Sequence, residues 1–418
     1  MDKLIIQGPA KLEGEVRVSR AKNAYLPILA AVLLSDKPVH LKNLPKLRDI
    51  KTMLALLERL GVEIKVKANV TTLCAKNLNS HLATYDLVKT MRASIFVLGP
   101  LLSRLGKARV SLPGGCAIGT RPIDIHLKNL EKMNAKIKIE SGYVDASTKS
   151  LQGTRLPLSF PSVGATENLM MAATLAEGET TIENAALEPE IDDLANFLNS
   201  MGAKIKGIGS PSLTIQGIRE FKEVEYEAIG DRIEAATYVM AGLMTQSSIK
   251  VSGFKTKHLD FVFECLKDMG GKLEVGDDYV QTTPCTLTAC SIDTAPFPGF
   301  PTDLQAQIMA LMTQAQGASL LSENIFENRF MHVPELQRLG AKISLKGPTA
   351  AIEGKTELSA APVMCTDLRA SAALVLAALV ARGETHVQRV YHLDRGYESL
   401  ELKLQKLGAK INRVKEEM

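Results

Sequence analysis

The sequence contains no tryptophan, and aromatic residues make up only 5% of its 418 residues. Proteins that bind single-stranded nucleic acid stack the bases on aromatic side chains, so this composition supports such a function poorly. The net charge of +4 is also too small to indicate a polyanionic partner. We therefore expect no nucleic-acid partner.

Long apolar segments are missing as well. The longest strongly apolar run, residues 372–381, has about half the length that a membrane-spanning helix needs. The first residues, MDKLIIQGPAKLEG, contain no apolar signal region. We expect a cytoplasmic protein that does not enter a membrane.

Metal-binding patterns are absent too. The six cysteines form no CxxC motif, and the seven histidines form neither HxH nor HxxxH. A zinc site is therefore not expected. In a cytoplasmic protein, the cysteines are expected to be reduced.

What the sequence does contain is a repeat of about 70 residues, present six times. In each copy an amphipathic helix pattern ends at a small break, and an alternating strand pattern follows, as in LLERLGVEIKV (56–66). The breaks fall at Gly61, Asn134, Gly202, Gly270, Gly340 and Gly408. Glycine and asparagine both suit the left-handed residue just past a helix end, so the breaks predict six helix C-termini.

Each copy also contains a second helix pattern that is apolar nearly all round and rich in alanine, such as ASAALVLAALVA (370–381). Such helices must be buried on most sides. The predicted order is strand, buried helix, strand, amphipathic helix, strand. It suits neither a TIM barrel, whose helices lie outside, nor an open Rossmann sheet. We expect buried helices wrapped by sheets, with the six units divided into two domains of three.

The segments that precede the buried helices share two features. All six contain Ser, Thr or Asp, which cap helices well: SRAKN, TMRAS, SVGAT, GDRIEA, PTDLQA and CTDLRAS. Helix N-termini favour anions, and four segments also carry a cation, namely Lys22, Arg92, Arg232 and Arg369. Loops add Arg121, Arg329 and Arg395. The set predicts a small, highly anionic substrate, bound in a cleft between the two domains.

The loop LPGGCAIGTRP (112–122) places Cys116 among three glycines and near Arg121. Glycine clusters mark turns, mobile loops or close backbone approaches. An exposed thiol beside an arginine has its thiolate favoured. The residues alone leave two interpretations open, a reactive cysteine and an ordinary surface turn.

Several of these segments together resemble the UDP-N-acetylglucosamine enolpyruvyl transferase family within the EPSP synthase superfamily. They are SRAKNA, MRAS, LPGGCAIGTRPIDIH, PSVGATEN, ENAALEPEI, PTDLQAQ, FENRFMHVPEL, TDLRASAALVLA and YHLDRGYE. The resemblance covers nearly the whole chain. It implies an α/β fold, an inside-out α/β barrel with two pseudo-threefold domains. One domain would span residues 21–229, the other residues 1–20 with 230–418, and the active site would lie in the cleft between them.

The resemblance also implies a reaction. The enolpyruvyl group of phosphoenolpyruvate passes to the 3-hydroxyl of UDP-N-acetylglucosamine by addition and elimination, and phosphate leaves. This is the first committed step of bacterial peptidoglycan synthesis. The chemistry needs a general acid, a general base and cations for the carboxylate and phosphate, but no metal or organic cofactor. No coiled-coil pattern suggests an assembly, and we expect a monomer.

The resemblance assigns roles to residues of this chain. Cys116 would donate the proton to phosphoenolpyruvate, Asp303 would act as the base, and Lys22 and Asp367 would complete the catalytic set. Phosphoenolpyruvate would be bound by Lys22, Asn23, Arg121, Arg369 and Arg395. UDP-N-acetylglucosamine would be bound by Arg92, Arg121, Pro122, Ile123, Asp124, Ile125, Ser162, Val163, Asp303, Ile325 and Arg329.

One residue departs from the family pattern. Phe160 stands where some members carry a lysine near the nucleotide, so it would serve packing or the uridine edge instead. Because the loop residue is Cys116, and not the aspartate of some members, we expect an epoxide-phosphonate antibiotic of the fosfomycin type to alkylate it.

Three alternatives follow from the same residues. The sister enzyme that uses shikimate 3-phosphate shares the repeats, but in our interpretation it lacks the LPGGC loop. A cysteine hydrolase could pair Cys116 with His126, although this leaves the cationic loops unexplained. A non-catalytic phosphate-ligand or RNA-end-binding protein is weakly supported by the basic loops. His126 itself could orient the loop, contact the nucleotide or be purely structural.

Overall fold

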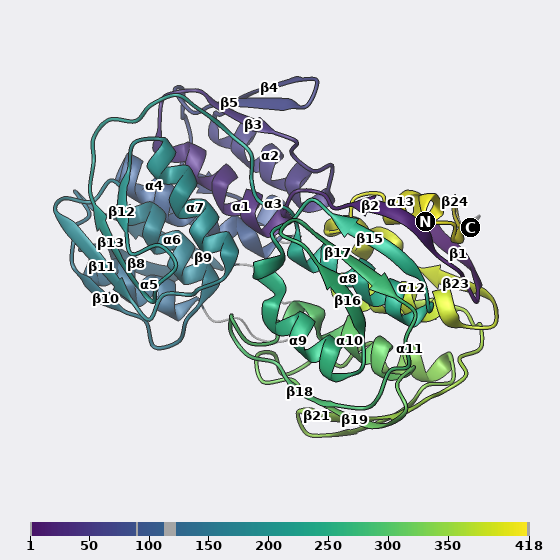
Figure 1. Cartoon of the computed structure of the whole chain (residues 1–418). Helices are drawn as coiled ribbons and strands as arrows, with labels where there is room; N and C mark the ends of the chain where they lie inside the picture. The colour runs from purple at the N-terminus through teal and green to yellow at the C-terminus, as the bar shows by residue number, and fades with distance from the viewer. Residues whose placement is uncertain (1, 89–90, 113–122, 416–418) are drawn as a thin grey trace. The chain divides into compact units, whose positions relative to one another are not determined.

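The computed structural model describes residues 2–88, 91–112 and 123–415 (Figure 1). These residues divide into two compact units. Unit 1 contains residues 2–19 and 230–415, and unit 2 contains residues 20–88, 91–112 and 123–229. Each unit encloses its own core of buried apolar side chains.

Unit 2 contains three four-stranded sheets with one common topology. In each, the first two strands are parallel and the other neighbours are antiparallel. The first sheet is β14(Val224–Tyr226), β3(Val39–Lys42), β5(Val70–Cys74) and β4(Glu63–Lys67). The second is β6(Leu82–Ala83), β7(Lys107–Ser111), β9(Tyr143–Ser147) and β8(Lys136–Glu140). The third is β10(Arg155–Pro157), β11(Glu179–Glu183), β13(Ser212–Gln216) and β12(Lys204–Lys206).

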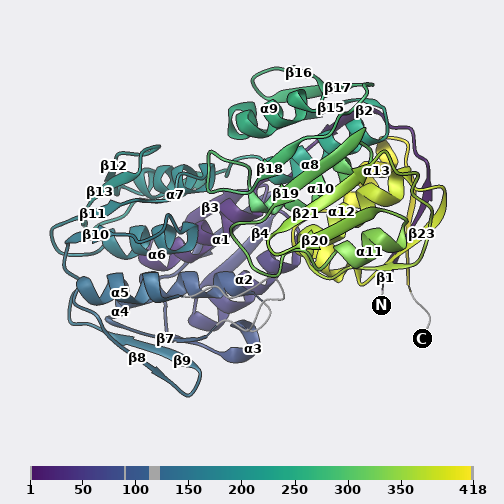
Figure 2. The same cartoon turned by 90° about the horizontal axis from the view of Figure 1, so that it is seen from below.

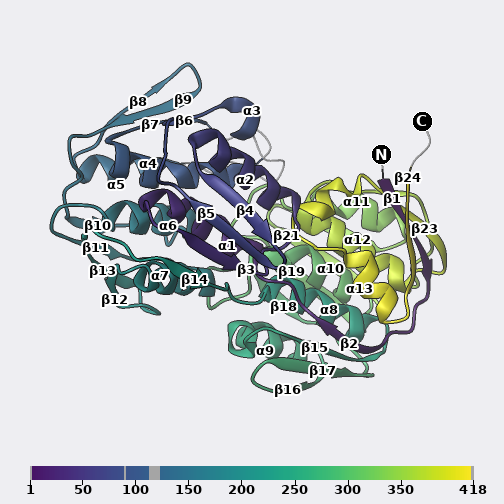
Figure 3. The same ribbon diagram turned by 90° about the horizontal axis from the view of Figure 1, so that it is seen from above.

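Unit 1 repeats this topology three times. The first sheet is β2(Glu13–Arg17), β15(Ser248–Ser252), β17(Tyr279–Thr283) and β16(Lys272–Val275). The second is β18(Ser291–Asp293), β19(Gly317–Ser322), β21(Thr349–Gly354) and β20(Lys342–Lys346). The third is β22(Val363–Met364), β23(Gly383–Gln388), β1(Asp2–Gly8) and β24(Lys410–Lys415). Strand β1 therefore lies between β23 and β24, side by side with both (Figure 3), and the chain's start completes the last sheet.

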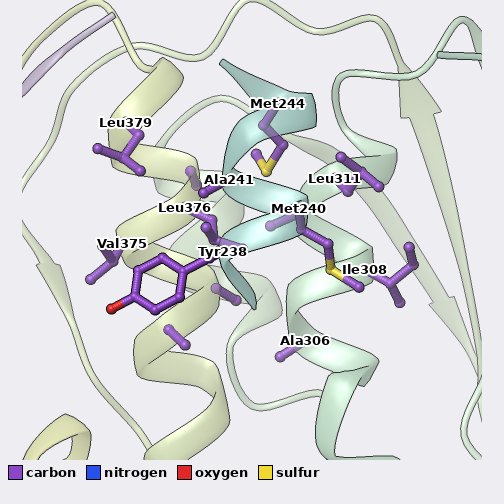
Figure 4. Close-up of a cluster of buried hydrophobic side chains, with 14 of the residues drawn as sticks. Tyr238, Met240, Ala241, Met244, Ala306, Ile308, Leu311, Val375, Leu376 and Leu379 are labelled. Atoms are coloured by element: carbon purple, nitrogen blue, oxygen red, sulfur yellow. The ribbon is translucent and has the colours of Figure 1, made fainter. Parts of the chain in front are cut away.

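Apolar helices fill the middle of each unit. In unit 1 they are α8(Arg232–Met244), α10(Gln305–Met312) and α12(Leu368–Val380), and they pack on one another (Figure 4). Every residue of α8 and α10 is buried. In unit 2 they are α1(Lys22–Ala31), α4(Leu98–Leu105) and α6(Val163–Ala173), extended by the 3-10 turns η1(Val32–Leu34) and η2(Arg92–Val97). The prediction of buried helices inside sheets is confirmed.

Amphipathic helices link the second and fourth strands of each sheet, in the strand orders given above. They are α2(Arg48–Leu60), α5(Asp124–Lys132), α7(Pro189–Ser200), α9(Asp260–Asp268), α11(Val333–Arg338) and α13(Leu400–Lys406). The six residues that follow their ends, from Gly61 to Gly408, all have positive φ, and even Asn134 has φ 72°. Figure 2 shows α5 beside the inner helix α6. Shorter elements are α3(Tyr85–Val88), η3(Thr256–Leu259), η4(Thr302–Leu304) and η5(Val390–Arg395).

Two local expectations need correction. The repeat unit ends in two antiparallel strands, such as β4 and β5, where the sequence predicted one. Side-chain capping also occurs at only three of the six inner helix starts, at Ser162, Asp231 and Asp367. The remaining N-cap positions are Ala21, Met91 and Pro301, and they offer no capping side chain.

Candidate functional site

The charged group of unit 1 is centred on Asp303, which lies in η4 at the start of α10. One carboxylate oxygen accepts a hydrogen bond from Arg329 Nη2 at 2.8 Å, and the other accepts from Arg369 Nη2 at 2.7 Å. The two arginine side chains are 4% and 5% exposed, whereas that of Asp303 is 29% exposed. One accessible carboxylate therefore holds two buried guanidinium groups that come from different segments.

These contacts determine the charge of Asp303. Burial alone would raise the pKa of its carboxyl, but the charges and hydrogen bonds of Arg369 and Arg329 outweigh it and hold the pKa well below its usual range. Burial would likewise lower the pKa of Arg369, and the Asp303 carboxylate outweighs it and raises that pKa. Asp303 and Arg369 are therefore both ionised at neutral pH.

A second carboxylate organises the loop that carries Arg329. Arg329 Nη1 donates to Thr302 Oγ1 at 3.1 Å, and Thr302 Oγ1 donates to Glu323 Oε2 at 2.8 Å. The other oxygen of Glu323 accepts the backbone N–H groups of Ile325 and Phe326 at 2.8 and 3.0 Å. Glu323 thus fixes both Arg329 and Ile325. The sequence analysis missed it, although it stands two residues before Ile325.

Asp367 and Arg395 also belong to unit 1. Asp367 caps α12, because its Oδ1 accepts from the backbone N–H groups of Arg369 and Ala370 at 2.9 and 3.0 Å. This cap places Asp367 beside Arg369 but commits one carboxylate oxygen to the helix. Arg395 is the last residue of η5 and is partly buried.

Unit 2 holds a different charged pair. Lys22 is the first residue of α1, and its Nζ lies 3.3 Å from Asp49 Oδ2 in the first turn of α2. The two side chains are 9% and 5% exposed. Asn23 follows Lys22 on the same helix. Asp49 was also missed, because only the packing of α1 on α2 brings it to Lys22.

The residues expected at the nucleotide sugar lie at several helix starts of unit 2. Arg92 begins η2, Ile123 precedes α5, and Asp124 and Ile125 are in its first turn. Ser162 Oγ accepts from the Ala165 N–H at 3.3 Å, and this bond caps α6, which begins at Val163. Phe160 is 45% exposed, which argues against the packing role considered above.

His126 is 6% exposed, and its protonation follows from its neighbours. Asn168 Oδ1 accepts from the Gly99 N–H at 2.7 Å, and Asn168 Nδ2 donates to Ile95 O at 3.0 Å, so the orientation of the amide is fixed. Nδ2 also lies 3.1 Å from His126 Nδ1, which must therefore be an acceptor. Burial lowers the pKa of His126 to about 4, against a small opposing effect of Asp124.

A neutral histidine of this kind is a weak base, which disfavours the cysteine hydrolase alternative. Its ring ties α5 to α6 through Asn168, so the structural interpretation of His126 has direct support.

Three of the expected site residues, Cys116, Arg121 and Pro122, lie outside the described residues, and of Arg92 only the backbone is described. In the described ranges, no group of three or more His, Cys, Asp or Glu side chains could hold a metal ion. In the same ranges, no helix combines the length and the apolar character that a membrane crossing requires.

Comparison with solved structures defines the class of protein. The fold is that of the enolpyruvyl transferase NikO from Streptomyces tendae, with a TM-score of 0.89, 26% identity and coverage of 100% of this chain and 99% of that one. EPSP synthase from Acinetobacter baumannii has the same fold at a TM-score of 0.78 and 16% identity, with both chains fully covered. The predicted inside-out α/β barrel is thereby confirmed.

Sequence comparisons then identify the family. Residues 6–404 match the family model of EPSP synthase (3-phosphoshikimate 1-carboxyvinyltransferase). UDP-N-acetylglucosamine 1-carboxyvinyltransferase from Trichlorobacter lovleyi is 54% identical over 418 residues and covers 100% of both chains. The enzyme of that name from Myxococcus xanthus is 52% identical over 419 residues, covering 99% of this chain and 100% of its own. The chain belongs to the EPSP synthase family, and the resemblance found in the sequence is confirmed.

Proposed function

We propose that this chain transfers the enolpyruvyl group of phosphoenolpyruvate to the 3-hydroxyl of UDP-N-acetylglucosamine and releases phosphate. The observation that carries the proposal is the 54% identity, over the whole length of both chains, to a relative named for that reaction. The EPSP synthase from Acinetobacter baumannii, in contrast, is only 16% identical to this chain. The nucleotide sugar is therefore favoured over shikimate 3-phosphate as the acceptor.

The described cations suit phosphoenolpyruvate, which carries a phosphate and a carboxylate. Lys22 in unit 2 and Arg369 and Arg395 in unit 1 supply positive charge at or near helix ends. Arginine forks match both anionic groups in geometry. Arg121 remains a fourth candidate from the sequence, and the placement of all four around one substrate stays a prediction.

Asp303 suits the role of a carboxylate at the sugar hydroxyl, since it is ionised and partly exposed. Its low pKa makes it a weak base while both arginines hold it. Phosphoenolpyruvate that engages Arg369 would weaken one of these ion pairs and raise the pKa of Asp303. The first substrate would thus strengthen the base that the second substrate needs.

The direct test measures phosphate release from phosphoenolpyruvate with UDP-N-acetylglucosamine, with shikimate 3-phosphate, or with no acceptor. We expect release only with the nucleotide sugar. Release only with shikimate 3-phosphate would assign the chain to the sister reaction. Tight binding of both substrates without release would favour the non-catalytic alternative.

Cys116 is proposed as the proton donor and as the target of epoxide-phosphonate antibiotics. Cys116→Ala should lose turnover and keep its affinity for the nucleotide sugar. Full activity of the wild-type protein after prolonged exposure to excess antibiotic would contradict this role. Mass spectrometry of the loop peptide would locate the adduct.

The remaining features are proposed with the function. We place the reaction in the cytoplasm, as the first committed step of peptidoglycan synthesis, and we expect a monomer that needs no metal or organic cofactor. Sedimentation of the purified protein tests the oligomeric state, and activity after dialysis against a chelator tests the metal requirement.

A further inference from the structure

Next to the Asp303 ion pairs, unit 1 contains a buried chain of hydrogen bonds between three elements. Gln307 on α10 donates from Nε2 to the hydroxyl of Tyr397 at 3.0 Å, and that hydroxyl lies 3.0 Å from Thr237 Oγ1 on α8. Gln307, Tyr397 and Thr237 are 0%, 2% and 2% exposed. Water therefore does not compete for these bonds, and each bond is stronger than it would be at the surface.

The directions of the hydroxyl protons in this chain can be assigned, and Gln307 Nε2 also lies 3.3 Å from Thr237 Oγ1 as a donor. Thr237 donates its only hydroxyl proton to Ile233 O at 2.8 Å, so it accepts from Tyr397. Tyr397 in turn accepts from Gln307. The amide nitrogen of Gln307 also donates to the backbone carbonyl of Asp303 at 3.0 Å, and a carbonyl can only accept, so the amide cannot be flipped.

The same tyrosine contacts the other side of the ion pair. The guanidinium carbon of Arg369 lies 5.7 Å from the centre of the Tyr397 ring. Because Arg369 is only 4% exposed, this cation–π contact is desolvated and therefore favourable. The contacts close a ring: the Asp303 carboxylate binds Arg369, Arg369 lies over Tyr397, and Tyr397 leads through Gln307 back to the Asp303 main chain.

We propose that Tyr397 and Gln307 are positioning residues for the reaction. Together they fix the guanidinium group of Arg369, the carboxylate of Asp303 and the main chain of Asp303 relative to one another. Neither is offered as a group that touches substrate. Tyr397 also stands two residues after Arg395, which is a third expected substrate contact. The contacts of Tyr397 therefore anchor the end of the segment that carries Arg395. The inference rests on the proposed function, whose base and cation it supports.

The kinetics of three variants separate the contribution of the Tyr397 hydroxyl from that of its aromatic ring. Tyr397→Phe and Gln307→Met break the hydrogen-bond chain and keep the ring, so kcat should fall about 10- to 100-fold, with an unchanged KM for phosphoenolpyruvate. Tyr397→Leu also removes the ring beneath Arg369 and should raise that KM as well. The KM for UDP-N-acetylglucosamine should stay within about twofold in all three.

A raised KM for phosphoenolpyruvate in Tyr397→Leu, together with a normal KM in Tyr397→Phe, is the result that a merely structural role of Tyr397 would not produce. The proposal is overturned if Tyr397→Phe and Gln307→Met keep wild-type kcat. It is also overturned if the Phe and Leu variants lose kcat and thermal stability in parallel with no change in KM.

The chain offers two matched controls. Tyr238, beside Thr237 on α8, is 1% exposed, and its hydroxyl is not part of the Gln307–Tyr397–Thr237 hydrogen-bond chain (Figure 4). Gln305, two residues before Gln307, is fully buried, and neither of its amide atoms has a hydrogen-bond partner within the described part of the chain. Tyr238→Phe and Gln305→Met should keep kcat within about twofold. Losses equal to those of Tyr397→Phe and Gln307→Met would overturn the proposal.

A measurement without turnover distinguishes this inference from the proposed function. The urea midpoint shift caused by Tyr397→Phe should be at least halved in an Asp303→Asn or Arg369→Gln background, because coupled residues are not additive. Equal shifts in all backgrounds would overturn the positioning role. Wild-type protein that releases no phosphate would instead contradict the proposed function, and the urea cycle would still decide whether Tyr397 is coupled to Asp303.

Discussion

Units 1 and 2 share one repeat but use the first turns of their inner helices differently. In unit 1, Asp303 before α10 and Arg369 on α12 form a charged group that Arg329 joins from a loop. In unit 2, α1 begins with Lys22 paired to Asp49, and α6 begins with a neutral serine cap. The alanine-rich parts of these helices are buried in both units. The repeat thus fixes where the candidate site residues lie, and the residue types in the first turn of each inner helix determine their charge.

The inner polar groups differ in the same way. In unit 1 they include two buried guanidinium groups, which need the Asp303 carboxylate to remain favourable. In unit 2, His126 and Asn168 are buried without charge and join three helical segments. Substitutions in unit 1 should therefore change charge balance and catalysis together, and those around His126 should change mainly stability.

The largest effect is expected for Asp303→Asn. The substitution removes the negative charge that holds Arg329 and Arg369 and removes the proposed base, so turnover should fall about 10²- to 10⁴-fold. Breaking the pairs should also lower the free energy of unfolding by about 3 kcal/mol. Phosphate release and urea unfolding measure the two losses. A near-normal rate would show that the base assignment is wrong.

In unit 2, Lys22→Met should lower kcat/KM for phosphoenolpyruvate about 100-fold, because it removes a cation expected at that substrate. Asp49→Asn keeps the cation and removes only the partner that orients it, so its loss should be nearer about tenfold. Initial rates at varied phosphoenolpyruvate test both. If Asp49→Asn matched Lys22→Met, Asp49 would have a role beyond orienting the lysine.

The fold was largely predictable because each repeat carries its own local signals. The breaks at Gly61 and Asn134 have φ of 101° and 72°, as the left-handed position after a helix requires. The second strand of each closing pair, such as β5 after β4, was not distinguished from the first in the sequence, although the two strands are neighbours in the chain. In the last sheet, β1 from the other end of the chain takes that place. A local sequence pattern cannot show that a strand near one end of the chain pairs with strands near the other end.

For the site, the cations at helix starts indicated Arg369, the family resemblance added Asp303, and the structure pairs the two. Glu323, Tyr397 and Gln307 were not found. Their roles depend on hydrogen bonds between segments that only the tertiary fold brings together. Capping was overestimated for a related reason. The preference of Ser, Thr and Asp for the N-cap position is weaker than the tertiary packing that determines where a helix starts, and α1 therefore starts after Ala21.

A smaller effect is expected from the pH dependence of unit 2. Burial lowers the pKa of His126 to about 4, so between about pH 6.5 and that value the unfolded chain binds a proton that the folded chain does not. The stability from a neutral His126 is therefore present above that range and lost as pH falls through it, by up to about 3 kcal/mol.

In His126→Gln, the part of the unfolding free energy that depends on the protonation of His126 should disappear. The free energy of unfolding should therefore change less between pH 7 and pH 4.5 than it does in the wild type. Urea titrations at several pH values measure it. His332→Gln is the counterpart in unit 1, since burial also lowers the pKa of His332 to about 4. Identical pH dependence in the wild type and His126→Gln would contradict the assignment.

The smallest effect concerns the caps that distinguish the helix starts. Ser162→Ala removes the side-chain acceptor for the Ala165 N–H and should cost about 1 kcal/mol of unfolding free energy. Asp367→Ala removes two such bonds beside Arg369, so it should cost more and should also raise the KM for phosphoenolpyruvate. Ser162→Thr keeps an acceptor and should restore most of the stability. If Ser162→Ala instead raised the KM for UDP-N-acetylglucosamine without a stability loss, its hydroxyl would serve the nucleotide sugar more than the helix.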